Sequence, residues 1–313
     1  MFGEALASLA EQTNVAFRVL VLAHDVPDLQ ASDLVGAGDE LLAGRIELVA
    51  VDGGDRARPL NVGLALARTS HVAFLDDDDV VDPDWVETFL NGAAGHPGMV
   101  IRAVTRDVDV ESVDDPPGYA VIRRRDVPPE RTRFDLIEHL KSNRSPICSF
   151  ALPIEQLRLH GLTFDESLQV MEDYDLLMRA VLALGVHDTG KVTSTYRRWA
   201  GAEASLNSVE TGRWLEAHTT VLKKLDAYPL HMPPGSVTKI VGLFGESEEL
   251  RGRIAGTIEK LNDERRAARA EVRSLHAQLR RTERRLSAME RSTSWRVTAP
   301  LRAFARRMWP RGG

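Results

Sequence analysis

Short runs of valine and leucine alternate with helix-like segments along the first ninety residues. Apolar and polar residues do not alternate along these runs, and such a pattern is typical of strands buried on both faces. We expect strands at Phe17–Ala23, Ile46–Val51 and Val72–Leu75. We expect helices from Phe2 to Leu9, from Pro59 to Arg68, and from an N-cap at Asp82 to about Leu90. This alternation predicts an α/β fold with a mainly parallel sheet flanked by helices.

Farther along the chain the pattern is less regular. The acidic, proline-containing stretch 105–135 is expected to be irregular, with a hairpin at Tyr119–Arg123. A helix is expected from Met171 to Leu184, ending at Gly185, and a strand at Lys191–Tyr196. The predicted organisation is an α/β domain over 1–200, a helical linker over 201–249, a coiled coil over 250–291 and a basic amphipathic tail over 292–313.

Charge is divided unevenly along the chain. The net charge is −6, but residues 251–313 carry +11 and residues 1–250 carry −17. The acidic residues 1–250 would repel the phosphates of nucleic acid, so nucleic acid is not an expected partner. Cys148 is the only cysteine, so no intrachain disulfide can form and a reducing, cytoplasmic location is expected. No apolar run reaches the length that spans a bilayer, and the N-terminus does not resemble a signal peptide.

Four consecutive aspartates, Asp76 to Asp79, follow directly on the run VAFL. Adjacent carboxylates repel one another, and a bound cation relieves that repulsion. Ligands of open α/β sheets bind at the carboxyl ends of the strands. Alternate residues of extended backbone point the same way, so Asp76 and Asp78 are expected to converge on one ion, Mg²⁺ or Mn²⁺. The alternative is a solvated acidic loop.

The surrounding motifs resemble those of glycosyltransferase family 2, over about residues 1–200. The segment Asn61–Trp85 is similar to the family's N-x-G…F-L-D-x-D-D…P-x-W core. Phe164–Leu168 and Glu172–Arg179 resemble its F-D-E-x-L…E-D-x-D-L-x-x-R segment, and Glu4–Thr13 resembles its first helix. The resemblance implies a GT-A, Rossmann-like fold. The family's usual first strand has no counterpart here, so a Val/Ile-rich strand is expected upstream of Met1.

The resemblance also implies roles for individual residues. Asp76 and Asp78 would hold the divalent ion on the sugar-nucleotide diphosphate. Asp77 and Asp79 would be near neighbours, with Asp77 among the residues that bind the nucleotide sugar and its ion. Asp173 would be the general base, with Glu172 next to it; the alternative is that both acids only stabilise a helix N-terminus. The residues expected near the nucleotide are His24, Asp25 and Arg58, and the alternative is that these, like Arg56, are ordinary loop residues.

The function expected from these motifs is transfer of a sugar from a nucleotide-sugar donor to a glycan or lipid-linked acceptor. The resemblance implies an inverting, metal-dependent reaction in bacterial surface polysaccharide biosynthesis. Processive relatives carry Q-x-x-R-W, whereas Thr195 stands four residues before Trp199 here, so transfer is expected to be non-processive. The alternative is a non-catalytic GT-A-like scaffold. A third alternative is a nucleotidyltransferase of similar fold. Such an enzyme would need a Gly-rich phosphate loop near the N-terminus, and this sequence lacks one.

The end of the chain is a separate module. Apolar residues recur at 3–4 spacing from Ile254 to Met289, interrupted at Arg265 and Thr282, which predicts a coiled coil and self-association over 250–291. The alternative is one helix folded back on the domain. In 294–309, Leu301, Phe304, Ala305, Met308 and Trp309 would share a face opposite Arg302, Arg306 and Arg307. This favours peripheral contact with an anionic inner membrane, and the alternative is packing against protein.

Overall fold

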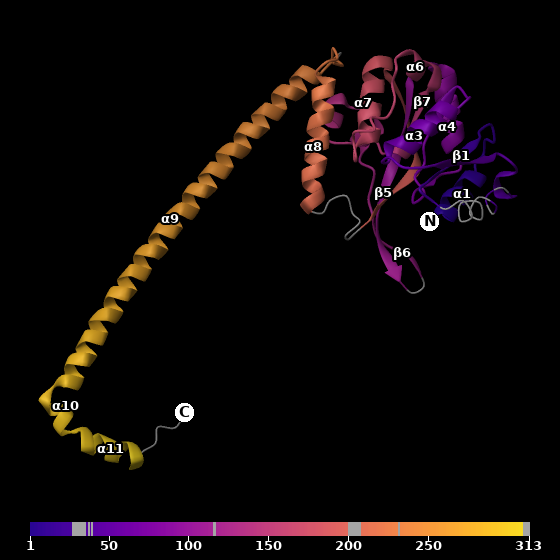
Figure 1. Ribbon diagram of the computed structural model, residues 1–313. Coiled ribbons are helices and arrows are strands. Elements are labelled where there is room, and N and C mark those ends of the chain that lie inside the picture. Colours follow the sequence, from indigo (N-terminus) through magenta and orange to yellow (C-terminus); the bar gives the residue numbers. More distant parts are fainter. Residues whose placement is uncertain are drawn as a thin grey trace. The chain divides into compact units, whose positions relative to one another are not determined.

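The computed structural model describes residues 1–26, 36, 38, 40–114, 117–199, 208–230 and 232–308 (Figure 1). The chain divides into two compact units, Met1–Pro234 and Gly235–Gly313. The first unit combines sheets and helices, so the predicted α/β class is confirmed. The division at residues 200, 249 and 291 remains a prediction.

Strands and helices follow one another through the first unit. Its strands are β1 (Val19–His24), β2 (Ile46–Val51), β3 (His71–Ala73), β4 (Val80–Val81), β5 (Val100–Asp114), β6 (Pro117–Arg124), β7 (Phe150–Pro153) and β8 (Val186–Trp199). Its α-helices are α1 (Phe2–Ala10), α3 (Ala57–Leu66), α4 (Trp85–Gly95), α5 (Leu136–Lys141), α6 (Ile154–Leu159), α7 (Glu172–Leu184) and α8 (Ser208–Leu225). Short 3-10 helices lie at Pro129–Thr132 and Ile147–Ser149.

The strands form two sheets. One pairs β1 with β2, and the other has the order β3-β7-β5-β8-β4, with β6 added on β5. Among the described strands only the pairs β1–β2 and β5–β8 are parallel, so the sheet is mixed and not mainly parallel as expected. The expectation came from the first ninety residues, where helices separate the strands. Later strands include a hairpin, and short connections allow only antiparallel pairing.

Two local predictions were wrong. Asp82 does not cap α4: the N-cap is Asp84, and the Asp82 carboxylate accepts two hydrogen bonds of 2.8 Å from Arg106. The stretch from 105 is not irregular either, because β5 runs to Asp114 and pairs with β6 in the expected hairpin. In β5, Val104, Val108 and Val110 are buried, and the charges between them are paired, as Asp107 is with Arg131.

Close packing positions the helices beside the acidic run. In α3, Gly63 lies against Leu22 of β1, and a Cβ at that position would be only 2.9 Å from the Leu22 Cδ1 atom. The side chain of Asn61 both donates to the carbonyl oxygen of Phe164 and accepts from its N–H, at 3.0 and 2.9 Å. These contacts join α3 to the loop before α7. The same loop is held to α8 by an ion pair of Asp165 with Lys224.

The second unit is helical. It consists of α9 (Ser236–Arg291), α10 (Thr293–Val297) and α11 (Ala299–Met308). Trp309 and the side chains of Ala305, Arg306, Arg307 and Met308 lie outside what the structure describes. Of the helices that are described, none has the length and hydropathy needed to cross a bilayer.

Candidate active site

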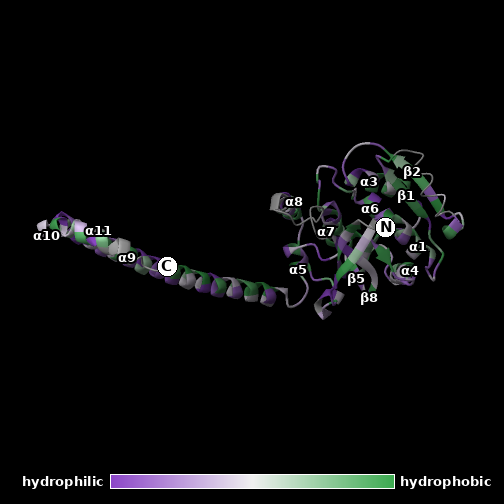
Figure 2. Cartoon of the chain, turned by 90° about the horizontal axis from the view of Figure 1, so that it is seen from below, coloured by the Kyte–Doolittle hydropathy of each residue, from purple (hydrophilic) through white to green (hydrophobic). Residues whose placement is uncertain are grey.

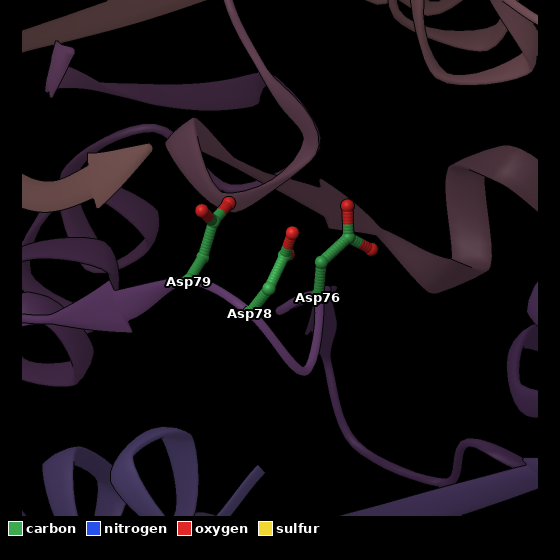
Figure 3. A group of neighbouring side chains, drawn as sticks. All are labelled: Asp76, Asp78 and Asp79. Atoms are coloured by element: carbon green, nitrogen blue, oxygen red, sulfur yellow. The ribbon is translucent and has the colours of Figure 1, made fainter. Parts of the chain in front are cut away.

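Three of the four consecutive aspartates converge after β3. Ligand oxygens of Asp76, Asp78 and Asp79 all lie within 4.8 Å of one another, and Figure 3 shows the three side chains pointing to one side of the backbone. The backbone is a turn here, closed by an N–H···O bond of 3.2 Å from Asp79 to Asp76, and not the extended strand expected. Asp77 lies in this turn, is exposed, and is not a member of the group.

Burial makes this group of carboxylates electrostatically unusual. Asp79 is fully buried and accepts hydrogen bonds from the Arg197 N–H at 2.8 Å and the Cys148 thiol at 3.6 Å. Burial raises the pKa of Asp79 to about 8. Burial also raises the pKa of Asp76 to about 6, an effect that Arg56 opposes and Asp78 reinforces. A cation at this place would therefore relieve both desolvation and mutual repulsion.

The third carboxylate is held by the end of β8. The indole N–H of Trp199 donates to Oδ2 of Asp78 at 2.8 Å, and the Arg197 guanidinium donates to the Asp78 carbonyl oxygen at 2.7 Å. The Trp199 ring lies edge-on to Tyr119 of β6, with 6.1 Å between ring centroids. Comparison with Q-x-x-R-W assigned Trp199 no role. Its contact with Asp78 depends on the pairing of β8 with β4 and could not be seen in the sequence.

If Asp78 is a metal ligand, Trp199→Phe is expected to weaken Mn²⁺ binding by about tenfold, because removal of a group that orients a metal ligand typically costs ~10–100-fold. Phenylalanine keeps an aromatic ring beside Tyr119 but cannot donate to Asp78. Titration of Mn²⁺ at fixed nucleotide sugar measures the effect. Trp214→Phe on α8 is the matched control, and equal affinities in the two variants would show that the indole N–H does not position Asp78.

A second acidic pair begins α7, whose first turn contains Glu172 and Asp173. The N-cap, Met171, has φ 65°, a left-handed conformation uncommon outside glycine. Glu172 is buried, and its Oε1 accepts from the Arg56 guanidinium at 3.0 Å. The same guanidinium lies 3.7 Å from the Asp76 carboxylate. Arg56 therefore links the two acidic groups, which come from segments almost a hundred residues apart.

Asp173 has polar partners of its own. Its Oδ2 accepts from the Asn143 amide at 3.1 Å, and its Oδ1 accepts from the Tyr174 N–H at 2.6 Å. The Ser145 N–H donates to Oδ1 of Asn143, which turns the amide nitrogen towards Asp173. Burial, followed by the charge of Glu172, raises the pKa of Asp173 to about 7. A carboxylate with this pKa is suited to accept a proton near neutral pH.

Asn143→Ala is expected to move the acid limb of the pH–rate profile to higher pH by about one unit, because a hydrogen bond to the ionised carboxylate favours the ionised form. If Asp173 acts as the base, the rate in the unsubstituted chain should fall as the pH falls through about 7, since a base must be deprotonated to act. The pH dependence of nucleotide-sugar hydrolysis measures both. A lower rate with an unshifted profile would mean that Asn143 does not act through Asp173.

Tyr196 is another neighbour that the motifs did not indicate. Burial raises the pKa of its hydroxyl, and the charges of Asp79, Asp173 and Asp76 raise it further. The phenol therefore lies within electrostatic reach of both acidic groups. It is one residue from Thr195, which takes the place of the glutamine in the processive motif.

The residues predicted to contact the nucleotide lie on neighbouring loops. His24 Nε2 is 3.2 Å from the Gly53 carbonyl oxygen, and Asp25 accepts from the Gly53 N–H at 2.8 Å. Both therefore border the loop between β2 and α3 that carries Arg56. Arg58 is exposed and lies over Gly54, whereas Arg56 contacts the acids. The roles predicted for His24, Asp25 and Arg58 remain predictions.

Comparison with known proteins agrees with the fold and with the family resemblance. Residues 1–152 match the family model described as Glycosyl transferase family 2. No curated protein sequence matches the chain.

Solved structures of S. aureus TarS share the fold. TarS residues 1–349 in complex with UDP-GlcNAc match with a TM-score of 0.55 at 20% identity, covering 74% of this chain and 64% of that one. Without that ligand the match has a TM-score of 0.53 at 18% identity, covering 74% and 63%. This chain thus spans less than two thirds of the TarS segment, and the likeness concerns the fold.

Proposed function

We propose that this chain, which belongs to glycosyltransferase family 2 over residues 1–152, transfers a sugar from a nucleotide-sugar donor to a hydroxyl acceptor. One observation carries the proposal. The converging carboxylates of Asp76, Asp78 and Asp79 lie next to a second acidic pair at the start of α7, with Arg56 between them. The proposed cation site and the proposed base are therefore adjacent, which suits transfer from a diphosphate to a hydroxyl.

The carboxylates after β3 fit a divalent cation. Their ligand atoms are all oxygen, which suits Mg²⁺ or Mn²⁺ better than softer metals. Asp76, Asp78 and Asp79 would hold the ion, with Trp199 and the Arg197 N–H fixing two of the three side chains. When bound, such an ion supplies positive charge that stabilises the leaving diphosphate.

Asp173 is the proposed general base. The acceptor oxygen attacks the anomeric carbon, and its proton passes to the Asp173 carboxylate as the new C–O bond forms. The bond from the anomeric carbon to the diphosphate oxygen breaks, and its electron pair leaves with the nucleoside diphosphate. A single displacement of this kind inverts the anomeric centre. His24 and Asp25 are proposed to contact the nucleoside and Arg58 the diphosphate, beside Arg56.

Hydrolysis of a panel of nucleotide sugars tests the proposal. Water is a poor acceptor, so slow release of nucleoside diphosphate is expected from one or a few members, dependent on Mn²⁺ or Mg²⁺. The pattern of release would also identify the nucleotide and the sugar. Donor binding without release by any member, even with candidate acceptors, would favour the non-catalytic scaffold.

The acceptor is proposed to be a glycan or a lipid-linked sugar used for a bacterial surface polysaccharide. The support is the exposed end of the second unit. In α11 the side chains of Leu301 and Phe304 are 70% and 66% exposed, and Arg302 stacks its guanidinium 3.7 Å from the centroid of the Trp295 ring. Apolar and cationic side chains at one helical end suit an anionic bilayer interface, where the enzyme would meet such an acceptor on the cytoplasmic side.

Truncation at Arg291 is expected to abolish sedimentation with liposomes that contain anionic lipid, because it removes α10 and α11. Full-length protein should sediment with these liposomes, and less so as salt is raised, since charge attraction is screened. Liposomes of neutral lipid alone are the control for composition. Equal sedimentation of the two proteins would contradict membrane contact through 294–309.

A further inference from the structure

One heptad frame holds along the whole of α9, and most of its a and d positions are apolar. The pattern begins at Val237, two heptads before the stretch expected from sequence, and continues to Met289. Figure 2 shows hydrophobic residues recurring along α9 among hydrophilic ones. The a positions are Val237, Phe244, Arg251, Ile258, Arg265, Val272, Leu279 and Leu286. The d positions are Ile240, Ser247, Ile254, Leu261, Ala268, Leu275, Thr282 and Met289.

This stripe is open to solvent in the single chain. Apart from Ile240, which is half-buried, its large apolar residues are between 50% and 68% exposed, namely Val237, Phe244, Ile254, Ile258, Leu261, Val272, Leu275, Leu279, Leu286 and Met289. A helix of 56 residues is about 84 Å long at ~1.5 Å per residue. Helices in water gain most of their stability by burying an apolar face. A strict a/d stripe of this length is the seam of a coiled coil.

The charges beside the stripe favour pairing of α9 with α9 of a second copy of this chain, in parallel register. In a parallel pair, each g residue faces the e residue five positions later on the partner. Glu264 then faces Arg269, and Arg285 faces Glu290, so opposite charges meet at both places. No g–e pair along α9 joins like charges. In an antiparallel pair with full overlap, Glu264 lies near the midpoint of the helix and would face Glu264 of the other copy. The two carboxylates would repel each other.

One of the two arginines within the stripe, Arg265, agrees with this register. Arg265 at an a position would lie beside Glu264 at the g position of the partner, so its guanidinium can reach a carboxylate at the edge of the seam. Polar residues at a positions lower stability but fix register and the number of strands. Arg265 interrupts the apolar repeat of the sequence, and in a parallel pair Glu264 supplies a carboxylate for its guanidinium.

We propose that α9 pairs with α9 of a second copy of this chain as a parallel, in-register coiled coil from Val237 to Met289. Both chains then enter the coil at the same end and leave it at the other. Two copies of 294–309 would therefore be presented together, and contact of one with a surface raises the effective concentration of the other. The proposal does not depend on the catalytic function of the first unit.

Cysteine cross-linking of the full chain tests both pairing and orientation. Thr282→Cys places a thiol at a d position, which faces its own copy only in a parallel, in-register pair. Ser274→Cys places one at an outer c position of the same helix. Cys148 is fully buried, so the added thiol is the accessible one. Mild oxidation is expected to give a disulfide-linked dimer for Thr282→Cys and little for Ser274→Cys; equal yields would overturn the register.

Charge reversal tests the partner selection. Glu264→Arg and Arg269→Glu should each weaken dimerisation by about tenfold, because two attractive pairs per dimer become repulsive. The double variant restores opposite charges between positions 264 and 269 and should recover most of the lost affinity. The part that is not recovered is expected from the loss of the Glu264 carboxylate beside Arg265. Light scattering and sedimentation equilibrium over a range of concentrations measure it. The mass of a single chain at every concentration, or a double variant as weak as the single ones, would overturn the proposal.

Discussion

Asp78→Asn is expected to weaken Mn²⁺-dependent binding of the nucleotide sugar by at least ~100-fold while the fold is kept. The estimate follows because loss of a group that merely orients a ligand already costs ~10–100-fold, and Asp78 is proposed to be a ligand itself. The amide can still accept the Trp199 hydrogen bond, so the local packing should persist. Calorimetric titration of the donor with Mn²⁺ present measures the loss, and circular dichroism confirms the fold.

Asp77→Asn separates ligand geometry from net charge. Asp77 is adjacent and carries the same charge, but it is exposed and outside the converging group. Its substitution should weaken binding by less than about tenfold, since exposed charges at some distance interact weakly in water. Equal losses for Asp77 and Asp78 would indicate that the acidic run acts only as a diffuse negative surface. Unchanged donor affinity in Asp78→Asn would remove the proposed metal site.

Asp173→Asn is expected to lower the transfer rate by ~10²–10⁴-fold with little change in donor affinity. A general base contributes about that factor, and it acts on the acceptor hydroxyl and not on the donor. The amide cannot take a proton, yet it matches the carboxylate in size beside Asn143 and the Tyr174 N–H. Initial rates at saturating donor, together with calorimetry of donor binding, separate the two effects.

Glu172→Gln is the comparison for that variant. Glu172 has its carboxylate engaged with Arg56, so its loss should disturb the link to Asp76 and affect donor binding as well as rate. A transfer rate near that of the unsubstituted chain in Asp173→Asn would exclude Asp173 as the base. The base would then have to be sought first at Glu172.

Local signals in the sequence were enough for much of the fold. Ile46–Val51 is a strand with the expected bounds, and α7 ends at Leu184 with Gly185 as its C-cap, whose φ of 76° suits glycine. Strand β5 was missed because its acidic residues suggest solvent. Their burial depends on arginines far along the chain, as for Asp107 with Arg131 and Arg198. The mixed pairing of the sheet was also missed, because the direction in which two strands pair depends on segments that are distant in the sequence.

The candidate site divides in a similar way. The aspartates after β3 and the pair at Glu172 stand in recognisable motifs, so their chemistry could be anticipated. Arg56 and Asn143 stand in no such pattern, and Trp199 stands only in an incomplete match to Q-x-x-R-W. All three meet the acids only when the chain folds. Arg56 and Arg58 are two residues apart in sequence, and only the direction of α3 decides which of them lies towards the acids.

Calorimetric titration of the full chain with a panel of nucleotide sugars tests most directly whether it is a nucleotide-sugar glycosyltransferase. At least one donor should bind with Mn²⁺ or Mg²⁺ present, and the heat should disappear with EDTA. Re-addition of the ion should restore binding, and Asp78→Asn should show none under the same conditions. Absence of binding by every donor, with either ion, would contradict the proposed function and leave the non-catalytic scaffold as the better description.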